Sequence, residues 1–163
     1  MEKSCIIYVL RHAKVYWGDH ENSVRPLSVE GEAQAQGLIQ ILSSLKLNAI
    51  YSSPYLRAKS TVKPFCEHTN MELRTHEDLR EGSRDESIPE IKNRIVNYTT
   101  SLAQKHLSQS ILLCTHGGIL FGLLSHINPT LGEDDYKKLR NPDLKKFIFN
   151  DNKLTHCEDF HFQ

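Results

Sequence analysis

The sequence lacks an excess of charge of either sign, a long hydrophobic run and a close pair of cysteines. Its 20 basic and 20 acidic residues cancel, so no broad basic surface is expected to bind nucleic acid or an anionic membrane. The apolar run at residues 5–10 is too short for a signal-peptide core or a membrane span. Four scattered cysteines argue against a disulfide framework. We therefore expect a cytoplasmic protein with reduced cysteines and with neither nucleic acid nor membrane as a partner.

The remaining composition is that of an ordinary globular protein. The chain has 163 residues, of which 39% are hydrophobic and 25% charged. A chain of this size can bury a hydrophobic core that is stable without disulfide bonds. No internal repeat or Pro/Ser-rich linker divides it. We expect one domain over residues 1–163, and the pattern indicates no particular oligomeric state.

Short apolar runs alternate with helical periodicity. Residues 5–10 and 110–115 have the continuous apolar character of strands buried on both faces, and residues 48–52 and 72–75 are weaker runs of the same kind. Helices are expected from Ser28 as N-cap through Leu45 and, following Pro54 as a first-turn residue, to about His68 with Pro64 as a kink. Pro89 should open a further helix from Glu90 to about His106, and a short one is expected over 117–127. This alternation predicts an α/β fold, a three-layer sandwich with a mostly parallel central sheet flanked by helices.

Two further segments depart from that alternation. The runs at 145–149 and 154–162 surround Asn150-Asp151-Asn152 and predict a C-terminal hairpin at the sheet edge. Residues 13–27 form the longest stretch near the start without a periodic pattern, and long loops often carry function. We therefore expect this loop to contribute to a site.

Polar side chains follow the two strongest strands. Arg11 and His12 come directly after residues 5–10, and His116 follows residues 110–115. Arg57 lies one turn into the helix that follows the third strand. Because ligands bind outside the carboxyl ends of parallel strands, these groups should converge with the first amides of the helix at Gly117. Each feature taken singly is more often a solvated or packed side chain, but together they predict a phosphate site.

The joint pattern resembles the histidine phosphatase superfamily, which includes the phosphoglycerate mutases and many small phosphatases. The matching segments occur in the family's order from residue 5 to about residue 127. They are Leu10-Arg11-His12-Ala13; Leu27-Ser28 with Gly31, Gln34 and Ala35; Ser53-Pro54-Tyr55-Leu56-Arg57-Ala58 with Thr61; Leu79-Arg80-Glu81-Gly82; and Thr115-His116-Gly117-Gly118, with Asn141 further on.

The resemblance implies a role for each of these side chains. His12 would be the nucleophile that is phosphorylated, Glu81 the proton donor, and Arg11, Arg57 and His116 the phosphate pocket. Imidazole suits this chemistry because it is largely neutral at pH 7 and needs no metal or cofactor to attack phosphorus. Phosphoryl transfer mainly requires positioning and charge stabilisation. We expect His12, Glu81 and His116 to be catalytic.

Further contacts to the substrate are expected around that pocket. The amide of Gly117 should help to bind phosphate, and Lys14 and Arg84 should contact the rest of the substrate from the rim. The sequence departs from the family's pattern at Ala13, Val15 and Gly18, where glycine, a hydroxyl residue and asparagine are usual. These departures remove one or two expected phosphate hydrogen bonds.

Three other functions fit the sequence less well. A metal site at Cys66 and His68, Cys114 and His116, or His156 and Cys157 is disfavoured because none of these pairs has ligand spacing. A nucleotide-binding fold is disfavoured because neither G-x-x-x-x-G-K nor G-x-G-x-x-G occurs. A phosphate-binding module without turnover would have lost His12, Glu81 or His116.

The last alternative is phosphoryl transfer of the mutase type. Fewer than thirty residues separate Glu81 from the strand at Ser110, and a helix uses most of them. Mutases of the family carry a larger insertion at this place, which keeps water from the phosphohistidine. We therefore predict a metal-independent phosphatase that hydrolyses a phosphomonoester. Its substrate is expected to be a phosphorylated small molecule or a phosphoprotein, such as a protein that carries a phosphohistidine.

Overall fold

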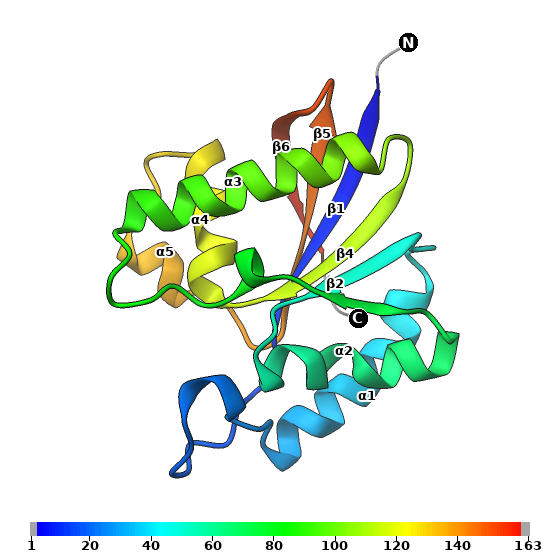
Figure 1. Cartoon of the computed structure of the whole chain (residues 1–163), viewed down its shortest axis with the longest axis vertical. Coiled ribbons are helices and arrows are strands. Elements are labelled where there is room, and N and C mark those ends of the chain that lie inside the picture. Colours follow the sequence, from blue (N-terminus) through cyan, green and yellow to red (C-terminus); the bar gives the residue numbers. More distant parts are fainter. Residues whose placement is uncertain (1–2, 161–163) are drawn as a thin grey trace.

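The computed structural model describes residues 3–160 and contains one mixed sheet in that range (Figure 1). The strands are β1 (Ser4–Arg11), β2 (Ala49–Ser52), β3 (Leu73–Thr75), β4 (Ser110–Thr115), β5 (Asp143–Asn150) and β6 (Lys153–Asp159). They lie in the order β3-β2-β4-β1-β5-β6. The first four strands are parallel, and β5 and β6 pair antiparallel. This confirms the predicted α/β class.

Helices cover both faces of the sheet. They are α1 (Val29–Ser43), α2 (Leu56–Thr69), α3 (Ile88–Lys105), α4 (Gly117–Ile127) and α5 (Glu133–Lys137). Helices α1 and α2 lie on one face, and α3, α4 and α5 lie on the other (Figure 1). The predicted three-layer sandwich is therefore confirmed. No helix within residues 3–160 is both long enough and apolar enough to cross a membrane.

The alternation of side chains along β1 builds a core on each face. Ile7 and Val9 pack in the cluster beneath α3 and α4, whereas Tyr8 and Leu10 pack in the cluster beneath α1 and α2. All four are buried. Burial on both faces explains why the sequence of this strand is a continuous apolar run.

Helix starts follow local hydrogen bonds. The Ser28 hydroxyl accepts from the amide of Gly31 at 3.0 Å, which confirms the predicted cap of α1. Ser87 and Glu90 form a capping box at the start of α3. The prediction that a helix follows Pro54 is confirmed, but Pro54 is not in the first turn of α2, because Tyr55 is the N-cap. Pro54 instead lies in a turn in which the Ser53 hydroxyl accepts from the Tyr55 amide.

The C-terminal hairpin is confirmed. Strands β5 and β6 pair antiparallel around Asp151 and Asn152, which adopt φ values of 49° and 65°, and β6 lies at the sheet edge. Asparagine and aspartate tolerate this left-handed region. The predicted last run, 154–162, extends beyond the described residues. The four cysteines are free thiols.

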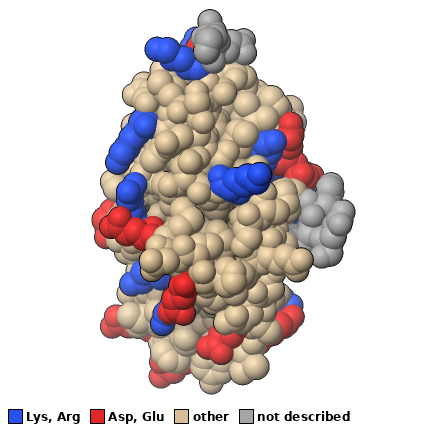
Figure 2. Space-filling view, turned by 90° about the vertical axis from the view of Figure 1, so that its right-hand side faces the viewer, with Lys and Arg blue, Asp and Glu red and all other residues tan. Residues whose placement is uncertain are grey.

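Two regions have more structure than the sequence indicated. The loop at 13–27 contains a β-bridge between Val15 and Leu27 and a 3₁₀ turn at Asn22–Val24. Helix α5 was not predicted, since its five residues are too short for apolar periodicity. Figure 2 shows basic and acidic side chains on the same face, separated by uncharged surface, in keeping with the balanced net charge.

Candidate active site

The pairing of β1 with β4 brings two histidines together. Arg11 at the end of β1 is in register with Thr115 at the end of β4, so His12 and His116 follow at the same edge. Their ring centroids are 5.3 Å apart. Strand β2 is the other neighbour of β4, and Arg57 lies in the first turn of the helix that follows it. The sheet therefore collects these side chains at the carboxyl ends of three parallel strands.

The ring of His12 is held in one orientation. Its Nδ1 lies 2.8 Å from the carbonyl oxygen of Ala13, so Nδ1 carries the proton and donates it to this acceptor. Its Nε2 accepts from Nε of Arg57 at 3.3 Å. Burial is the main cause that lowers the pKa of His12 to about 4, and the Arg57 and Arg11 cations act in the same direction, against the raising effect of the Ala13 bond. His12 is thus a neutral imidazole with an unprotonated Nε2 at pH 7.

His116 is the more deeply buried of the pair. It is fully inaccessible to solvent, and its Nε2 lies 2.8 Å from the hydroxyl of Ser53. Burial lowers its pKa to about 2, with His12 as the next cause. Its Nδ1 has no hydrogen-bond partner among residues 3–160. The geometry therefore keeps a second neutral imidazole beside the first.

Arg57 and Glu81 form an ion pair at the site. Nη2 of Arg57 donates to Oε2 of Glu81 at 2.7 Å, and the Glu81 side chain is 41% exposed. Asn22 binds both groups, because its carbonyl accepts from Nη1 of Arg57 and its amide donates to the same Glu81 oxygen at 2.9 Å. Sequence reasoning did not single out Asn22. The only available signal was its position in the 13–27 loop.

Arg11 is held by backbone oxygens and by a glycine. Its Nη1 donates to the carbonyl of Leu139 at 3.0 Å, and its Nε is buried without a partner in the described part of the chain. A Cβ at Gly117 would lie 2.8 Å from Cζ of Arg11. The absence of a side chain at Gly117 therefore allows the Arg11 guanidinium to pack against the start of α4. This role of Gly117 does not depend on what its backbone amide binds.

The departures from the family's first motif are accommodated. Ala13 does not adopt a positive φ, so the usual glycine is not needed for the backbone here. Its amide donates to the Thr61 hydroxyl at 2.9 Å. Val15 is used in the bridge to Leu27, and Gly18 lies against the ring of Tyr16.

The two predicted rim cations have different surroundings. Lys14 lines the pocket and pairs with Glu30 at 2.7 Å. Arg84 is exposed on the loop that follows Glu81 and does not line the pocket. The pocket is thus lined by Arg11, His12, Lys14, Arg57 and Glu81, whereas the predicted site residues Arg84, His116 and Gly117 do not line it.

These side chains surround a cavity of about 590 Å³. Its walls carry four cationic side chains, Arg11, Lys14, Arg25 and Arg57, and two carboxylates, Glu30 and Glu81. An excess of guanidinium and ammonium groups favours an anionic ligand, and guanidiniums suit the geometry of phosphate. Among residues 3–160 no three His, Cys, Asp or Glu side chains are grouped so that they could hold a metal ion.

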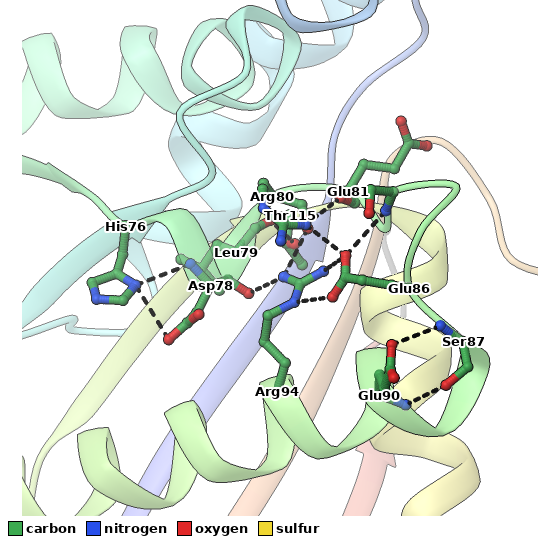
Figure 3. A network of polar contacts seen from close by, with 11 residues as sticks. His76, Asp78, Leu79, Arg80, Glu81, Glu86, Ser87, Glu90, Arg94 and Thr115 are labelled. Atoms are coloured by element: carbon green, nitrogen blue, oxygen red, sulfur yellow. Dashed lines mark hydrogen bonds and ion pairs between the residues drawn. The ribbon is translucent and has the colours of Figure 1, made fainter.

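A second ionic network supports the segment that carries Glu81 (Figure 3). Glu86 accepts from Arg80 at 2.7 Å and from Arg94 of α3 at 2.9 Å. Arg94 also donates to the carbonyl oxygens of Asp78 and Arg80. The Arg94 hydrogen bond is the main cause that holds the pKa of Glu86 at about 2, and the Arg80 hydrogen bond adds to it against the raising effect of burial. The network ties the backbone on both sides of Glu81 to α3.

Comparisons with known proteins show which family the chain is similar to. The model of the histidine phosphatase superfamily, branch 1, matches residues 7–85. Phosphoserine phosphatase 1 of Hydrogenobacter thermophilus is 25% identical, over 68% of this chain and 70% of that protein. Residues 7–85 thus match branch 1 of the histidine phosphatase superfamily, the phosphoglycerate mutase-like group.

Solved structures share the fold. A mutant phosphoserine phosphatase of Entamoeba histolytica in complex with phosphoserine superimposes with a TM-score of 0.77 and 18% identity, covering 94% of this chain and 96% of that one. A phosphoglycerate mutase of Bacillus anthracis str. Sterne gives a TM-score of 0.83 and 16% identity, covering 98% and 93%. Phosphatases and a mutase therefore share this architecture.

Glu86→Gln should lower the free energy of unfolding by about 1–2 kcal/mol at pH 7, because two guanidiniums lose their anionic acceptor. The pKa of Glu86 is lowered in the folded protein, so its stabilising effect is present above the unfolded pKa and is lost as the pH falls toward 2. Urea unfolding of both proteins across this range measures the difference. The control Glu67→Gln, in an exposed pair with Lys63, should change stability by less than about 0.5 kcal/mol. A Glu86→Gln effect that is independent of pH would contradict the ionic network.

Proposed function

We propose that this protein is a phosphatase that hydrolyses a phosphomonoester through a phosphohistidine at Nε2 of His12. The observation that carries the proposal is the state of the His12 ring. Its Nδ1 is bound to the Ala13 carbonyl and its Nε2 faces the site beside Arg57. A neutral imidazole fixed in this way has a lone pair ready to attack phosphorus.

In the first step, the cations of the site bind the phosphoryl group of the substrate. Arg11 and Arg57 neutralise its oxygens, with the Gly117 amide and the neutral His116 beside them. The Nε2–P bond forms while the ester P–O bond breaks. Glu81 donates its proton to the departing oxygen, so the leaving group departs as an alcohol.

In the second step, water attacks the phosphohistidine. Glu81, now a carboxylate, takes the proton from the water as its oxygen bonds to phosphorus. The P–N bond breaks, inorganic phosphate leaves and His12 returns to its neutral form. Because Arg57 donates to Glu81, phosphate binding at Arg57 would compete with this ion pair and free the carboxyl group for proton transfer.

The open rim supports hydrolysis over transfer of the mutase type. Only residues 82–87 separate Glu81 from the start of α3, which leaves no long segment to cover the phosphohistidine. On the other side Trp17 lines the pocket and is 82% exposed. Access of water to the intermediate favours release of inorganic phosphate.

Phosphoserine is the first substrate to assay, because a curated relative is a phosphoserine phosphatase. The proposed substrate class includes phosphorylated small molecules and phosphorylated protein side chains, both of which an open pocket admits. Lys14 would contact the part of the substrate beyond the phosphate. Arg84, exposed on the loop after Glu81, would reach only a large substrate such as a phosphoprotein.

His12→Ala should reduce phosphate release by about 10⁴-fold or more, because the variant cannot form the covalent intermediate. Wild-type protein quenched during turnover should carry an acid-labile phosphoryl group that His12→Ala lacks. His126→Ala, which changes an exposed histidine in the last turn of α4, is the matched control and should keep wild-type activity. Activity of His12→Ala within about tenfold of wild type would contradict the assignment.

Glu81→Gln should slow the hydrolysis of alkyl phosphates by about 10²- to 10⁴-fold and of aryl phosphates far less, because an alkoxide needs the proton more than a phenolate does. The measurement is kcat/KM for phosphoserine and p-nitrophenyl phosphate. Glu77→Gln, at an exposed site in the same segment, is the control. Equal losses on both substrates would show that Glu81 is not the proton donor.

A further inference from the structure

A second cavity of about 680 Å³ lies between the start of α3, α4 and α5. Its walls are mainly apolar, with Ile88, Ile91, Phe121, Leu131 and Tyr136 as the large side chains. Ile88 is 78% exposed, which is unusual for a large aliphatic side chain in a hollow. The size and the apolar lining are those of a small-molecule site.

Tyr136 is a shared wall of this cavity and the candidate active site, since it lines both. On the active-site side, the guanidinium of Arg11 lies 5.9 Å from the centroid of the Tyr136 ring. On the cavity side, Phe121 packs edge-on against the same ring at 5.7 Å. A group bound at Arg11 is thus one aromatic side chain away from the apolar cavity.

The segment that carries Glu81, the proposed proton donor, also packs against the wall of the apolar cavity. Gly82, the residue after Glu81, packs so closely on Ile91 that a Cβ there would clash with Cδ1. Ile91 is part of the cavity wall. The donor acts on the leaving-group oxygen, so the leaving group must extend from the region of Glu81.

We infer that this cavity binds the apolar part of the leaving group, an unbranched alkyl chain or an aryl group, of the phosphomonoester whose phosphate lies at Arg11 and Arg57. The inference rests on the proposed function and adds a substrate class to it. The polar side chains of the cavity are few, and Lys92 is engaged with the carbonyl of Ser125 at 3.4 Å. The cavity therefore selects by burial of apolar surface, at roughly threefold to fourfold in affinity per methylene.

The test uses alkylphosphonates, whose C–P bond is not hydrolysed, so binding is measured without turnover. Calorimetry on the wild-type protein should show octylphosphonate binding at least about 50-fold more tightly than ethylphosphonate, because six further methylenes are buried. Gly132→Leu should remove most of this difference. Gly132 lines the cavity, and a Cβ there meets nothing within 4 Å, so the new side chain fills the cavity without displacing the fold.

Two further variants keep the test specific. Ser125→Phe fills the cavity from α4 and should have the same effect as Gly132→Leu. Gly37→Leu is the matched control, because Gly37 also has open space at its Cβ but lies on α1, on the opposite face of the sheet. It should keep the full preference for the octyl chain.

Equal affinities for the two phosphonates in the wild-type protein would overturn the inference. So would 1-octanol binding as tightly as octylphosphonate, because the cavity would then act independently of the phosphate site. The same experiment distinguishes failure of this inference from failure of the proposed phosphatase function. Octylphosphonate binding that Gly132→Leu weakens, in a protein that hydrolyses no phosphomonoester, would support the subsite and reject the phosphatase.

Discussion

The parallel pairing of β1 with β4 is the constraint on which the site depends. With Arg11 opposite Thr115, the residues that follow the two strands leave the sheet together, and both imidazoles reach the same edge. A slip of one residue would turn the apolar side chains of β1 toward the wrong core. The burial that stabilises the sheet therefore also fixes the distance between His12 and His116.

Burial among cations gives the site its chemical character. Taking His12 out of water lowers its pKa to about 4, and the guanidiniums act in the same direction. A protonated histidine would be a poor nucleophile, so the arginines that suit a phosphate also help to keep the ring neutral. The carbonyl of Ala13 sets which nitrogen faces the site. One group of contacts thus serves both the proposed binding and the proposed attack.

The sequence predicted most of the fold because its strongest signals are physical necessities. Apolar runs at residues 5–10 and 110–115 are required of strands covered on both faces, and polar side chains directly after them lie at the ligand-binding edge. The structure brings Arg11, His12, Arg57, Glu81 and His116 together, while their catalytic roles remain predictions.

What the sequence did not predict depends on tertiary contacts. Asn22 binds Arg57 and Glu81 only because the 13–27 loop folds back over α2, and one asparagine in a loop carries no periodic signal. Helix α5 is a short helix of mostly polar residues, yet its Tyr136 lines both cavities. Pro54 was wrongly expected in the first turn of α2, because proline favours both a first helical turn and the turn that precedes it.

The central claim is that His12 is a neutral imidazole with a free Nε2 at the pH of catalysis. Nitrogen NMR of the histidine rings, with His12 assigned by the spectrum of His12→Gln, measures both the charge and the tautomer. The account predicts an Nδ1–H tautomer that stays neutral at pH 7 and titrates near pH 4. A titration near the ordinary histidine value of about 6.5, or a proton on Nε2, would contradict it.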